Sequence, residues 1–494
     1  MRKMKENACN NKNQKKNPGF LLSAVSSNSG KTAAACGLMS AFKQEGKRVC
    51  ACKCGPDYID PMFHREVLGV DSKNLDLFFS EEDILKEGYL KHTKDADITI
   101  AEGVMGFYDG MSLDSVKGSS YDVAQTLGLP VILVINARGA AMTLVATVKG
   151  IVEFRPDSNI RGILLNRVSA MLYPRLKEML ENGLARIGHD EIKIVGYMPE
   201  NEVFHLESRH LGLVTPQEME NLQEKVRQAG EILTKTVDLE LLEQIASEAA
   251  VWKAEVSEES EKIGSLKSLN YPVRIAVARD EAFCFYYKDN LELLESLGCE
   301  LIEFSPLHDK KLPENVKGIL LGGGYPELYG KELAENQSML ESIRRALDDK
   351  IPCLAECGGF MYLHEEMEDT AGNVWKLVGR IKGKTFPTGK LVRFGYVNLQ
   401  RNLDEDQISE LKERMSIADS WILPGENIRA HEFHYWDSTD SGSDWLAVKP
   451  DGKRKWECIH MEENLVAGYP HLYYPSCKEF AERFVEKCRS GYGE

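Results

Sequence analysis

The run "CLAECGGFMYL" places a cysteine where a nucleophile could be presented to a substrate. Cys357 follows a short apolar stretch and precedes two glycines, Gly358 and Gly359, whose small size permits a sharp turn. A strand, a tight turn and a helix in this order form a nucleophile elbow, and the helix N-terminus is expected to lower the thiol pKa. Cys353, inside the apolar stretch, is expected to be a buried structural thiol. The pattern predicts covalent catalysis by Cys357.

A cysteine nucleophile also needs donors for an oxyanion and a base for its proton. The run "GILLGGGYPELY" places three glycines, Gly322 to Gly324, directly after another apolar stretch, so their free backbone N–H groups are predicted to form an oxyanion hole. Three later histidines are candidates for the base: His471 in "LVAGYPHLYYP", and His431 and His434 in "RAHEFHYW". Spacing alone does not choose among them.

A second kind of chemistry is indicated near the N-terminus by "SAVSSNSGKTAAACGLMSAF". A loop of small residues between a strand and a helix exposes backbone N–H groups that can bind phosphate. Lys31 could reach the β- and γ-phosphates of ATP, and the Thr32 hydroxyl could hold Mg²⁺. Val25 stands where the strict phosphate-loop pattern has glycine. The strand–loop–helix context still favours a deviant phosphate loop over a simple Ser/Gly turn.

Acidic residues follow two further strands of the same predicted sheet. Glu102 ends "ITIAE", and Asp57 and Asp60 lie in "KCGPDYIDPMFH". Because parallel strands bring their carboxyl ends to one edge, Glu102 is predicted to meet the nucleotide's Mg²⁺ there. For Asp60 a ligand role and a turn or cap role are equally open. Asn166, at the end of "RGILLN", could bind the adenine edge or the local backbone.

These residues must be positioned by two α/β domains. Apolar runs such as "FLLSAV", "RVCACKC", "ITIAEG", "VILVIN", "RGILLN" and "IKIVGYM" alternate with helical patterns, which predicts a parallel sheet with flanking helices. A Glu-, Lys- and Ser-rich segment interrupts the alternation, which restarts at "YPVRIAVARD". The predicted division is a basic disordered tail at 1–17, an ATP-binding domain at 18–250, a linker at 251–270 and a second α/β domain at 271–490.

Composition excludes several classes of protein. The chain of 494 residues has a net charge of −16, which argues against non-specific nucleic-acid binding. Its most apolar stretch, "VILVINARGAAMTLVATVKGIV", is interrupted by polar and charged residues, so no membrane span is predicted. The N-terminus lacks the apolar core of a secretory signal. Twelve scattered cysteines predict reduced thiols in the cytoplasm, and "CACKC" lacks the usual zinc-ligand spacing and predicts a buried strand.

Together the motifs resemble the cobyrinic acid a,c-diamide synthase family, from about residue 19 to residue 485. The half with "ECGG", "GGGYPE" and a late histidine is similar to a class I glutamine amidotransferase, and the half with "SNSGKT" is similar to dethiobiotin synthetase. The stretches "KCGPDYIDPMFH", "AEGVMGFYDG", "RHLGLV", "AFCFYYKDNLELLE" and "HEFHY" extend the resemblance. It implies ATP- and glutamine-dependent amidation of the a and c acetates of cobyrinic acid through an acyl phosphate, with Mg²⁺ as cofactor.

The resemblance also assigns roles to individual residues, including the base. The implied site residues are Cys357 and His471 for catalysis; Gly323 and Gly324 for the oxyanion hole; Ser29, Gly30, Lys31, Thr32 and Asn166 for ATP; Thr32, Asp57 and Glu102 for Mg²⁺; and Tyr58, Asp60, Asp109, Arg209 and His210 for the substrate. Since the substrate carries many carboxylates, a locally basic cleft of Arg209, His210 and Lys53 is predicted.

Two departures from the family pattern matter. Tyr473 stands two residues after His471, where class I amidotransferases usually carry a carboxylate, so a Cys–His dyad or an orienting group from elsewhere is implied. The segment "ESRHLGLV" replaces a common Pro-Glu-Arg-His, although Arg209 and His210 remain.

Several alternatives stay open. The same chemistry could act on hydrogenobyrinate or nickel sirohydrochlorin, and a cobyric acid synthase would amidate other side chains. A non-amidating nucleotide-switch ATPase would have no use for Cys357. The motifs do not decide whether the chain forms a homodimer.

Overall fold

A computed structural model of the chain describes residues 17–206, 216–250, 272–403 and 420–490. The chain divides into two compact units, residues 1–255 and 256–494. Nearly all of the predicted tail, the predicted linker and the candidate residues Arg209 and His210 lie outside the described residues. None of the helices within those ranges is both long and apolar enough to span a membrane.

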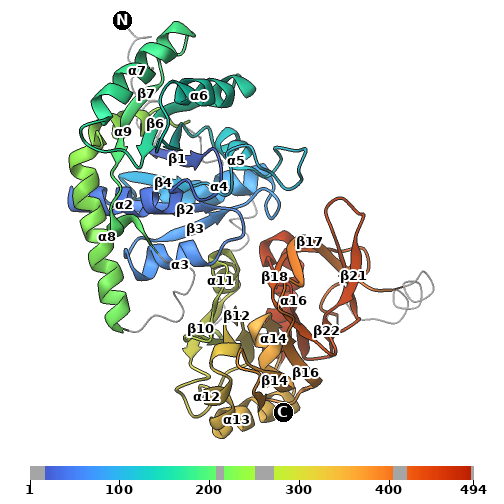
Figure 1. Cartoon of the computed structure of the whole chain (residues 1–494). Coiled ribbons are helices and arrows are strands. Elements are labelled where there is room, and N and C mark those ends of the chain that lie inside the picture. Colours follow the sequence, from blue (N-terminus) through green and yellow to red (C-terminus); the bar gives the residue numbers. More distant parts are fainter. Residues whose placement is uncertain (1–16, 207–215, 251–271, 404–419, 491–494) are drawn as a thin grey trace, which may run out of the picture. The chain divides into compact units, whose positions relative to one another are not determined.

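Unit 1 is built on a seven-stranded parallel sheet with helices packed on it (Figure 1). Its strand order is β3-β2-β4-β1-β5-β6-β7. The elements are β1 (Gly19–Ala24), α2 (Lys31–Gln44), β2 (Val49–Cys54), α3 (Ile59–Glu66), β3 (Ser72–Leu75), α4 (Glu82–Thr93), β4 (Ile98–Glu102), α5 (Ser120–Leu127), β5 (Val131–Asn136), α6 (Met142–Phe154), β6 (Ile160–Asn166), α7 (Tyr173–Arg186), β7 (Lys193–Met198), η2 (Glu202–Phe204), α8 (Pro216–Thr236) and α9 (Leu239–Ala246).

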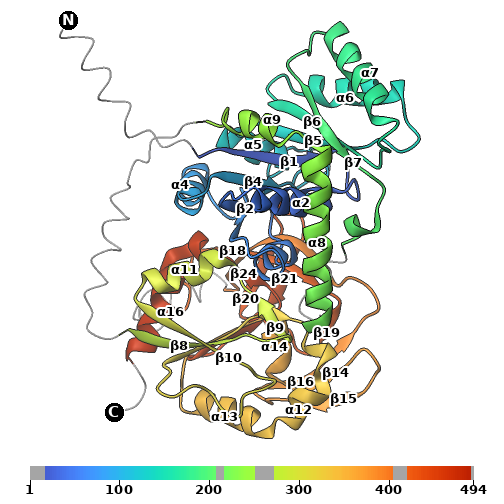
Figure 2. The ribbon, with the colours of Figure 1, turned by 90° about the vertical axis from the view of Figure 1, so that its left-hand side faces the viewer.

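Most strands of this sheet are continuous apolar runs because they are buried. Every residue of β1 is buried, as expected where helices cover both faces of a parallel sheet. Helix α8 packs closely along α2 (Figure 2), and a Cβ added to Gly37 would lie 2.7 Å from Leu233 Cδ1. Strand β3 was not predicted, since its sequence, "SKNL", is short and mostly polar. Asn74 in that strand donates to the carbonyls of Gly55 and Asp57 at 2.8 and 2.7 Å, which fixes the "CGPDYID" loop.

Unit 2 contains a six-stranded sheet of order β10-β8-β11-β13-β23-β22, parallel except for the edge strand β22. Smaller sheets have the orders β12-β9, β15-β14-β16-β19 and β21-β20-β17-β18-β24. The elements are β8 (Val273–Ala278), β9 (Phe283–Phe285), α11 (Lys288–Ser296), β10 (Cys299–Phe304), β11 (Gly318–Leu321), β12 (Gly323–Gly324), η4 (Pro326–Leu328), α12 (Gly330–Glu335), α13 (Gln337–Asp348), β13 (Cys353–Glu356), α14 (Gly358–Tyr362), β14 (His364–Glu368), β15 (Val374–Lys376), β16 (Ile381–Pro387), β17 (Arg393–Arg401), β18 (Ile428–His434), β19 (Trp436–Ser438), β20 (Trp445–Val448), β21 (Lys455–Cys458), β22 (His460–Met461), β23 (Leu465–Gly468), β24 (His471–Leu472), η6 (Tyr474–Cys477) and α16 (Lys478–Ser490).

Alternate side chains of the central strands enter two hydrophobic clusters of unit 2. Ile319 and Cys353 belong to one cluster, whereas Leu320 and Leu354 belong to the other. Cys353 is thus a buried core thiol, as predicted. The two-domain α/β prediction is confirmed. The additional four- and five-stranded sheets were not predicted, because partly exposed strands lack the continuous apolar runs of a parallel core.

Candidate active sites

Cys357 occupies a strained turn between β13 and α14. Its backbone has φ 48° and ψ −103°, in a region that non-glycine residues rarely adopt. Its N–H donates to the Gly468 carbonyl at 2.8 Å, which anchors the turn to β23. A Cβ added to Gly359 would lie 2.1 Å from the Leu321 carbonyl oxygen, so only glycine fits there. The predicted strand–turn–helix elbow is present.

The expectation of a lowered thiol pKa is wrong for this structure. Burial, and then the charges of Glu327, Glu356 and Glu432, raise the pKa of Cys357 well above its ordinary value. Helix α14 is only five residues long, and the thiol is 8% exposed. Desolvation and nearby acids therefore outweigh the helix N-terminus, and Cys357 is a thiol rather than a thiolate in this state.

Of the three candidate bases, His471 contacts the predicted oxyanion loop. Strand β24, which holds His471, pairs antiparallel with β18. A Cβ added to Gly323 would lie 2.4 Å from His471 Cε1, so the imidazole is packed against this glycine. A Cβ added to Gly358 would lie 3.1 Å from the Gly324 nitrogen, so the same loop also packs on the elbow. Elbow, oxyanion loop and His471 thus form one cluster.

The other two histidines flank this cluster. His431 is the register partner of His471, and burial lowers its pKa to about 3. His434 is bound through Nδ1 to the Trp436 carbonyl at 2.7 Å and stacks on Tyr469 at 4.0 Å. Burial, and then His431 and His434, lower the pKa of His471 to about 3, so its ring is neutral.

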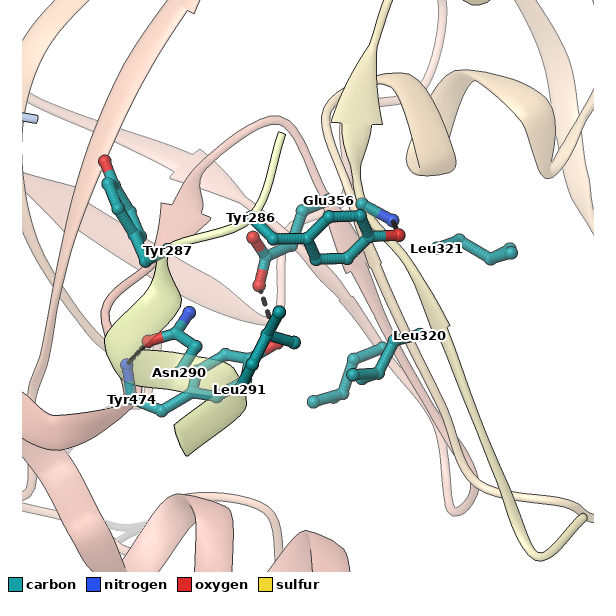
Figure 3. Close-up of a pocket in the computed structure, with 10 residues that line it drawn as sticks. Tyr286, Tyr287, Asn290, Leu291, Leu320, Leu321, Glu356 and Tyr474 are labelled. Atoms are coloured by element: carbon teal, nitrogen blue, oxygen red, sulfur yellow. Dashed lines mark hydrogen bonds between the residues drawn. The ribbon is translucent and has the colours of Figure 1, made fainter. Parts of the chain in front are cut away.

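Glu356 is a functional candidate that the sequence reasoning missed. Its Oε2 lies 4.0 Å from His471 Nδ1, and its Oε1 accepts a hydrogen bond from the Tyr474 hydroxyl at 3.0 Å (Figure 3). Burial raises the pKa of Glu356 to about 8. A carboxylate therefore stands beside the imidazole even though Tyr473 occupies the usual position. The only sequence signal was its place next to Cys357 in "ECGG", which was interpreted as part of the turn.

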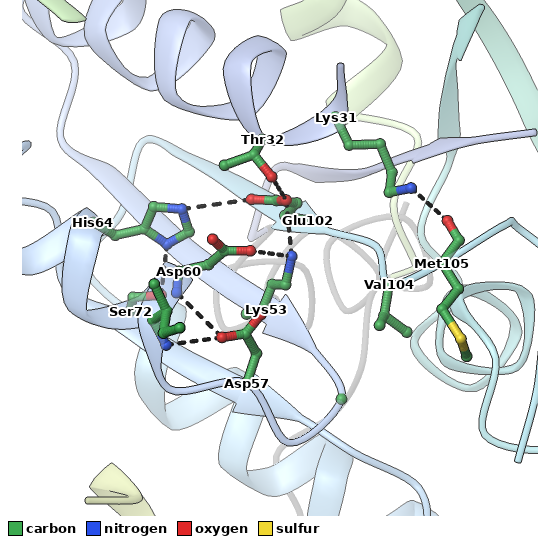
Figure 4. Close-up of polar contacts among 12 residues, drawn as sticks. Lys31, Thr32, Lys53, Asp57, Asp60, His64, Ser72, Glu102, Val104 and Met105 are labelled. Carbon is green, nitrogen blue, oxygen red and sulfur yellow. Dashed lines mark hydrogen bonds and ion pairs between the residues drawn. The ribbon is translucent and has the colours of Figure 1, made fainter. Parts of the chain in front are cut away.

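In unit 1 the phosphate loop joins β1 to α2 as predicted. Gly30 has φ 95°, which favours glycine, and Ser29 Oγ donates to the Ser26 carbonyl at 2.9 Å. The Lys31 ammonium donates to the Ser26 carbonyl at 3.2 Å and to the Met105 carbonyl, so it spans the loop (Figure 4). Burial, and then Lys53, lower the pKa of Lys31 to about 8.

Thr32 and Glu102 meet beneath this loop. The Thr32 hydroxyl donates to Glu102 Oε1 at 2.7 Å, and Glu102 Oε2 is buried with no hydrogen-bond partner among the described residues. A hydroxyl and a carboxylate are ligands that Mg²⁺ prefers, so the residues present fit this ion. Burial acts to raise the pKa of Glu102, but Lys53 and His64 hold it below its ordinary range.

Lys53 is part of this buried cluster rather than a cleft cation. Its ammonium lies 2.5 Å from Asp60 Oδ2 and 2.8 Å from Glu102 Oε1, and its side chain is 5% exposed (Figure 4). The predicted contribution of Lys53 to an unpaired basic cleft is therefore wrong, because two carboxylates already neutralise it. Burial raises the pKa of Asp60 to about 7 even though Lys53 acts to lower it.

The remaining predicted residues occupy turns and caps. Asp57 Oδ1 accepts from the Ile59 and Asp60 nitrogens at 2.8 and 3.3 Å. Asp109 Oδ2 accepts from the Gly106 nitrogen at 2.8 Å.

Two further predicted residues lie close to the nucleotide and acidic loops. Asn166 Nδ2 donates to the Ser29 carbonyl at 2.8 Å, the local-backbone role left open above. Tyr58 is the cap residue before α3.

Comparison with known proteins finds a family match for each of the two units. A family described as CobQ/CobB/MinD/ParA nucleotide binding domain matches residues 21–214, and one described as CobB/CobQ-like glutamine amidotransferase domain matches residues 274–477. A cobyrinate a,c-diamide synthase of Caldanaerobacter subterraneus subsp. tengcongensis is 37% identical over 95% of this chain and 98% of its own length. Proteins of the same name from Clostridium tetani and Fusobacterium nucleatum subsp. nucleatum are 38% and 39% identical, over 95% and 94% of this chain and 99% of their own lengths.

Proposed function

The chain belongs to the cobyrinate a,c-diamide synthase family, and from this premise we propose how its residues divide the reaction between the two units. It is an ATP-dependent carboxylate amidoligase that takes nitrogen from glutamine, in cobalamin biosynthesis. We assign ammonia release to unit 2 and carboxylate activation to unit 1.

In unit 2, Cys357 attacks the side-chain amide of glutamine. His471 is neutral and takes the thiol proton; the resulting thiolate adds to the amide carbon. The N–H groups of the Gly323–Gly324 loop stabilise the oxyanion, and the imidazolium returns its proton to the leaving ammonia. Water then hydrolyses the thioester to glutamate. Glu356 lies beside His471 and orients its ring.

In unit 1, an acetate carboxylate of the corrinoid attacks the γ-phosphate of ATP and forms an acyl phosphate. Activation is needed because a carboxylate is a poor electrophile at neutral pH. Lys31, released from the Met105 carbonyl, binds the phosphoryl oxygens. Bound Mg²⁺ would be held by Thr32, Glu102 and Asp57 and would offset the negative charge of the phosphates. Ammonia displaces phosphate, and two rounds amidate the a and c groups.

The proposal also covers the residues that bind the substrate, the cellular location and the oligomeric state. Arg209, His210, Tyr58, Asp60 and Asp109 are assigned to the corrinoid. Cytoplasmic location is supported by the described cysteines, which are all free thiols. Light scattering of the purified protein tests whether it forms a homodimer.

One observation carries the assignment of unit 2: the elbow of Cys357 packs against the same glycine loop that His471 contacts. The test is Cys357→Ser assayed for amidation with glutamine or with ammonia. Glutamine-dependent amidation should fall by about 1,000-fold or more while ammonia-dependent amidation stays within about twofold of wild type. The matched control is Cys353→Ser in β13, the strand that precedes Cys357. The folded fraction of this variant should keep its glutamine-dependent activity. Full glutamine use by Cys357→Ser would refute the proposal.

The substrate is tested by incubating purified protein with ATP, glutamine and a panel of tetrapyrrole acids. Cobyrinate, hydrogenobyrinate and nickel sirohydrochlorin are compared by mass spectrometry. A gain of two amides on cobyrinate supports the proposed substrate, and amidation of another acid in its place overturns it.

A further inference from the structure

Glu327 lies on the segment that packs against the Cys357 elbow, and it has no role in the reaction described above. It belongs to η4, which directly follows the oxyanion loop. A Cβ added to Gly358 would lie 2.9 Å from Pro326 Cδ, so the segment that carries Glu327 packs on the elbow itself. After burial, the charge of Glu327 is the strongest influence that raises the pKa of Cys357. Glu327 therefore borders the space where the amide of glutamine must bind.

This carboxylate has no partner of opposite charge. Among the described residues, none forms an ion pair with Glu327, and the only donor that acts on it is its own backbone N–H. Burial raises the pKa of Glu327 to about 7. Glu327 is only partly exposed to solvent, and an ammonium group that bound beside this unpaired carboxylate would neutralise its charge.

A second polar group borders the same space. Tyr469 is 5% exposed, and its hydroxyl has no hydrogen-bond partner among the described residues. Its ring packs edge-on against Phe360 of α14 with the centroids 5.0 Å apart, which places the phenol on the helix that follows Cys357. Burial, and then the charges of Cys357, Asp437 and Glu327, raise its pKa. Buried polar groups are nearly always hydrogen-bonded, which indicates a polar ligand here.

We propose that Glu327 binds the α-ammonium group of glutamine and thereby selects an α-amino acid amide over simple amides. The inference rests on the proposed glutaminase function of unit 2. Glutamine offers one cation, its α-ammonium, at a fixed distance from the amide that Cys357 attacks. A charge-assisted N–H···O bond to Glu327 would neutralise the carboxylate, and the Tyr469 hydroxyl would bind a polar atom of the same ligand. Glu327 is thus a specificity-determining residue rather than a catalytic one.

The test is Glu327→Gln in the full chain, with glutaminase activity measured on L-glutamine and on glutarate monoamide, which is glutamine without its amino group. KM for glutamine should rise by about 10- to 100-fold with a smaller change in kcat, since a charged hydrogen bond is lost. kcat/KM for glutarate monoamide should change by less than about threefold, because this substrate has no ammonium to lose. Tyr469→Phe should raise KM for glutamine by less than Glu327→Gln does.

Ammonia-dependent amidation by Glu327→Gln reports whether the protein is folded. Glu332 of α12 is exposed, and Glu332→Gln is the matched control that should leave the activity on both substrates unchanged. An equal loss with both amides, or an unchanged KM for glutamine, would overturn the role of Glu327. Such a result would leave the glutaminase assignment intact as long as wild type hydrolyses glutamine and Cys357→Ser does not. If Glu327→Gln fails to fold, wild-type selectivity for glutamine over glutarate monoamide of less than about tenfold would equally overturn the proposal.

Discussion

Glu102 and Glu356 are both buried carboxylates at strand ends, yet their surroundings move their pKa values in opposite directions. Burial acts to raise both values, but Glu102 is held below its ordinary range by Lys53 at 2.8 Å. Glu356 has the Tyr474 hydroxyl and no such cation, and burial raises its pKa to about 8. Lys53 and His64, the cations near Glu102, thus keep it an anion, whereas Glu356 lacks them and is a largely uncharged acid beside a histidine.

Glu356→Gln should change the stability of unit 2 in a pH-dependent way. In wild type the pKa of Glu356 rises from 4.5 to about 8 on folding, so the unfolded chain loses its proton first and stability falls as pH rises through this interval. The Gln side chain at position 356 does not titrate, so this loss is absent from the variant. Its free energy of unfolding should therefore rise relative to wild type by about 1.4 kcal/mol for each pH unit between 4.5 and 8. Urea unfolding at pH 5 and pH 8 measures the difference, with Glu332→Gln as control. An equal difference at both pH values would contradict the prediction.

Arg209→Ala should separate substrate binding from ammonia release. Loss of one cation for a polycarboxylate substrate should raise the KM for the corrinoid by about tenfold or more, while glutaminase activity stays close to wild type. Steady-state assays with varied corrinoid and, separately, with glutamine alone measure both. If both activities collapse together, or neither changes, the assignment of Arg209 is wrong.

At the scale of elements, β12 acts as a spacer between the elbow and β24. It consists of Gly323 and Gly324, pairs with β9, and leaves no room for a side chain beside His471. A Cβ added to Gly324 would lie 2.0 Å from the Ala282 carbonyl oxygen, so crowding demands glycine at both positions of β12. In the proposed mechanism this loop both positions His471 and offers its N–H groups to the oxyanion.

Gly323→Ala should displace His471 and impair glutamine hydrolysis. The added methyl would overlap Cε1 of the imidazole at 2.4 Å, so kcat for glutaminase should fall by about 100-fold. Ammonia-dependent amidation should persist. Gly150→Ala, where nothing lies within 4 Å of the added Cβ, is the control and should keep full activity. A fully active Gly323→Ala enzyme would show that His471 does not need its observed position.

At the scale of the whole molecule, each unit has its own hydrophobic core. One cluster lies against the sheet of unit 1, and two clusters lie on the faces of the six-stranded sheet of unit 2. Because the cores are separate, we expect that each unit can be altered or stabilised without unfolding the other.

Calorimetry should therefore resolve two unfolding transitions. Saturation with ADP and Mg²⁺ at about 100 times Kd should stabilise the transition of unit 1 by about 2.7 kcal/mol. Phe480→Ala removes a fully buried ring of α16 and should destabilise only the other transition, by about 3–5 kcal/mol. A single transition shifted by both changes would show that the units unfold together.

Much of this protein was predictable because the decisive signals are local. The strand–turn–helix around Cys357, the phosphate loop before α2 and the buried strands of both units follow from residue types a few positions apart. Backbone sterics, burial and loop size act over such short distances, so the sequence by itself determined the two α/β units, the turn that holds Cys357 and the nucleotide loop.

Tertiary structure alone decided the features that join distant residues. Spacing did not distinguish His471 from His431 or His434, and only the fold shows that the His471 imidazole packs against Gly323. Only the fold brings Glu356 next to Tyr474, 118 positions later, and Lys53 onto Glu102. Only the fold surrounds Cys357 with acids that raise its pKa instead of lowering it. Desolvation and Coulomb interactions depend on what is close in space, and chain spacing does not specify that for residues on different strands.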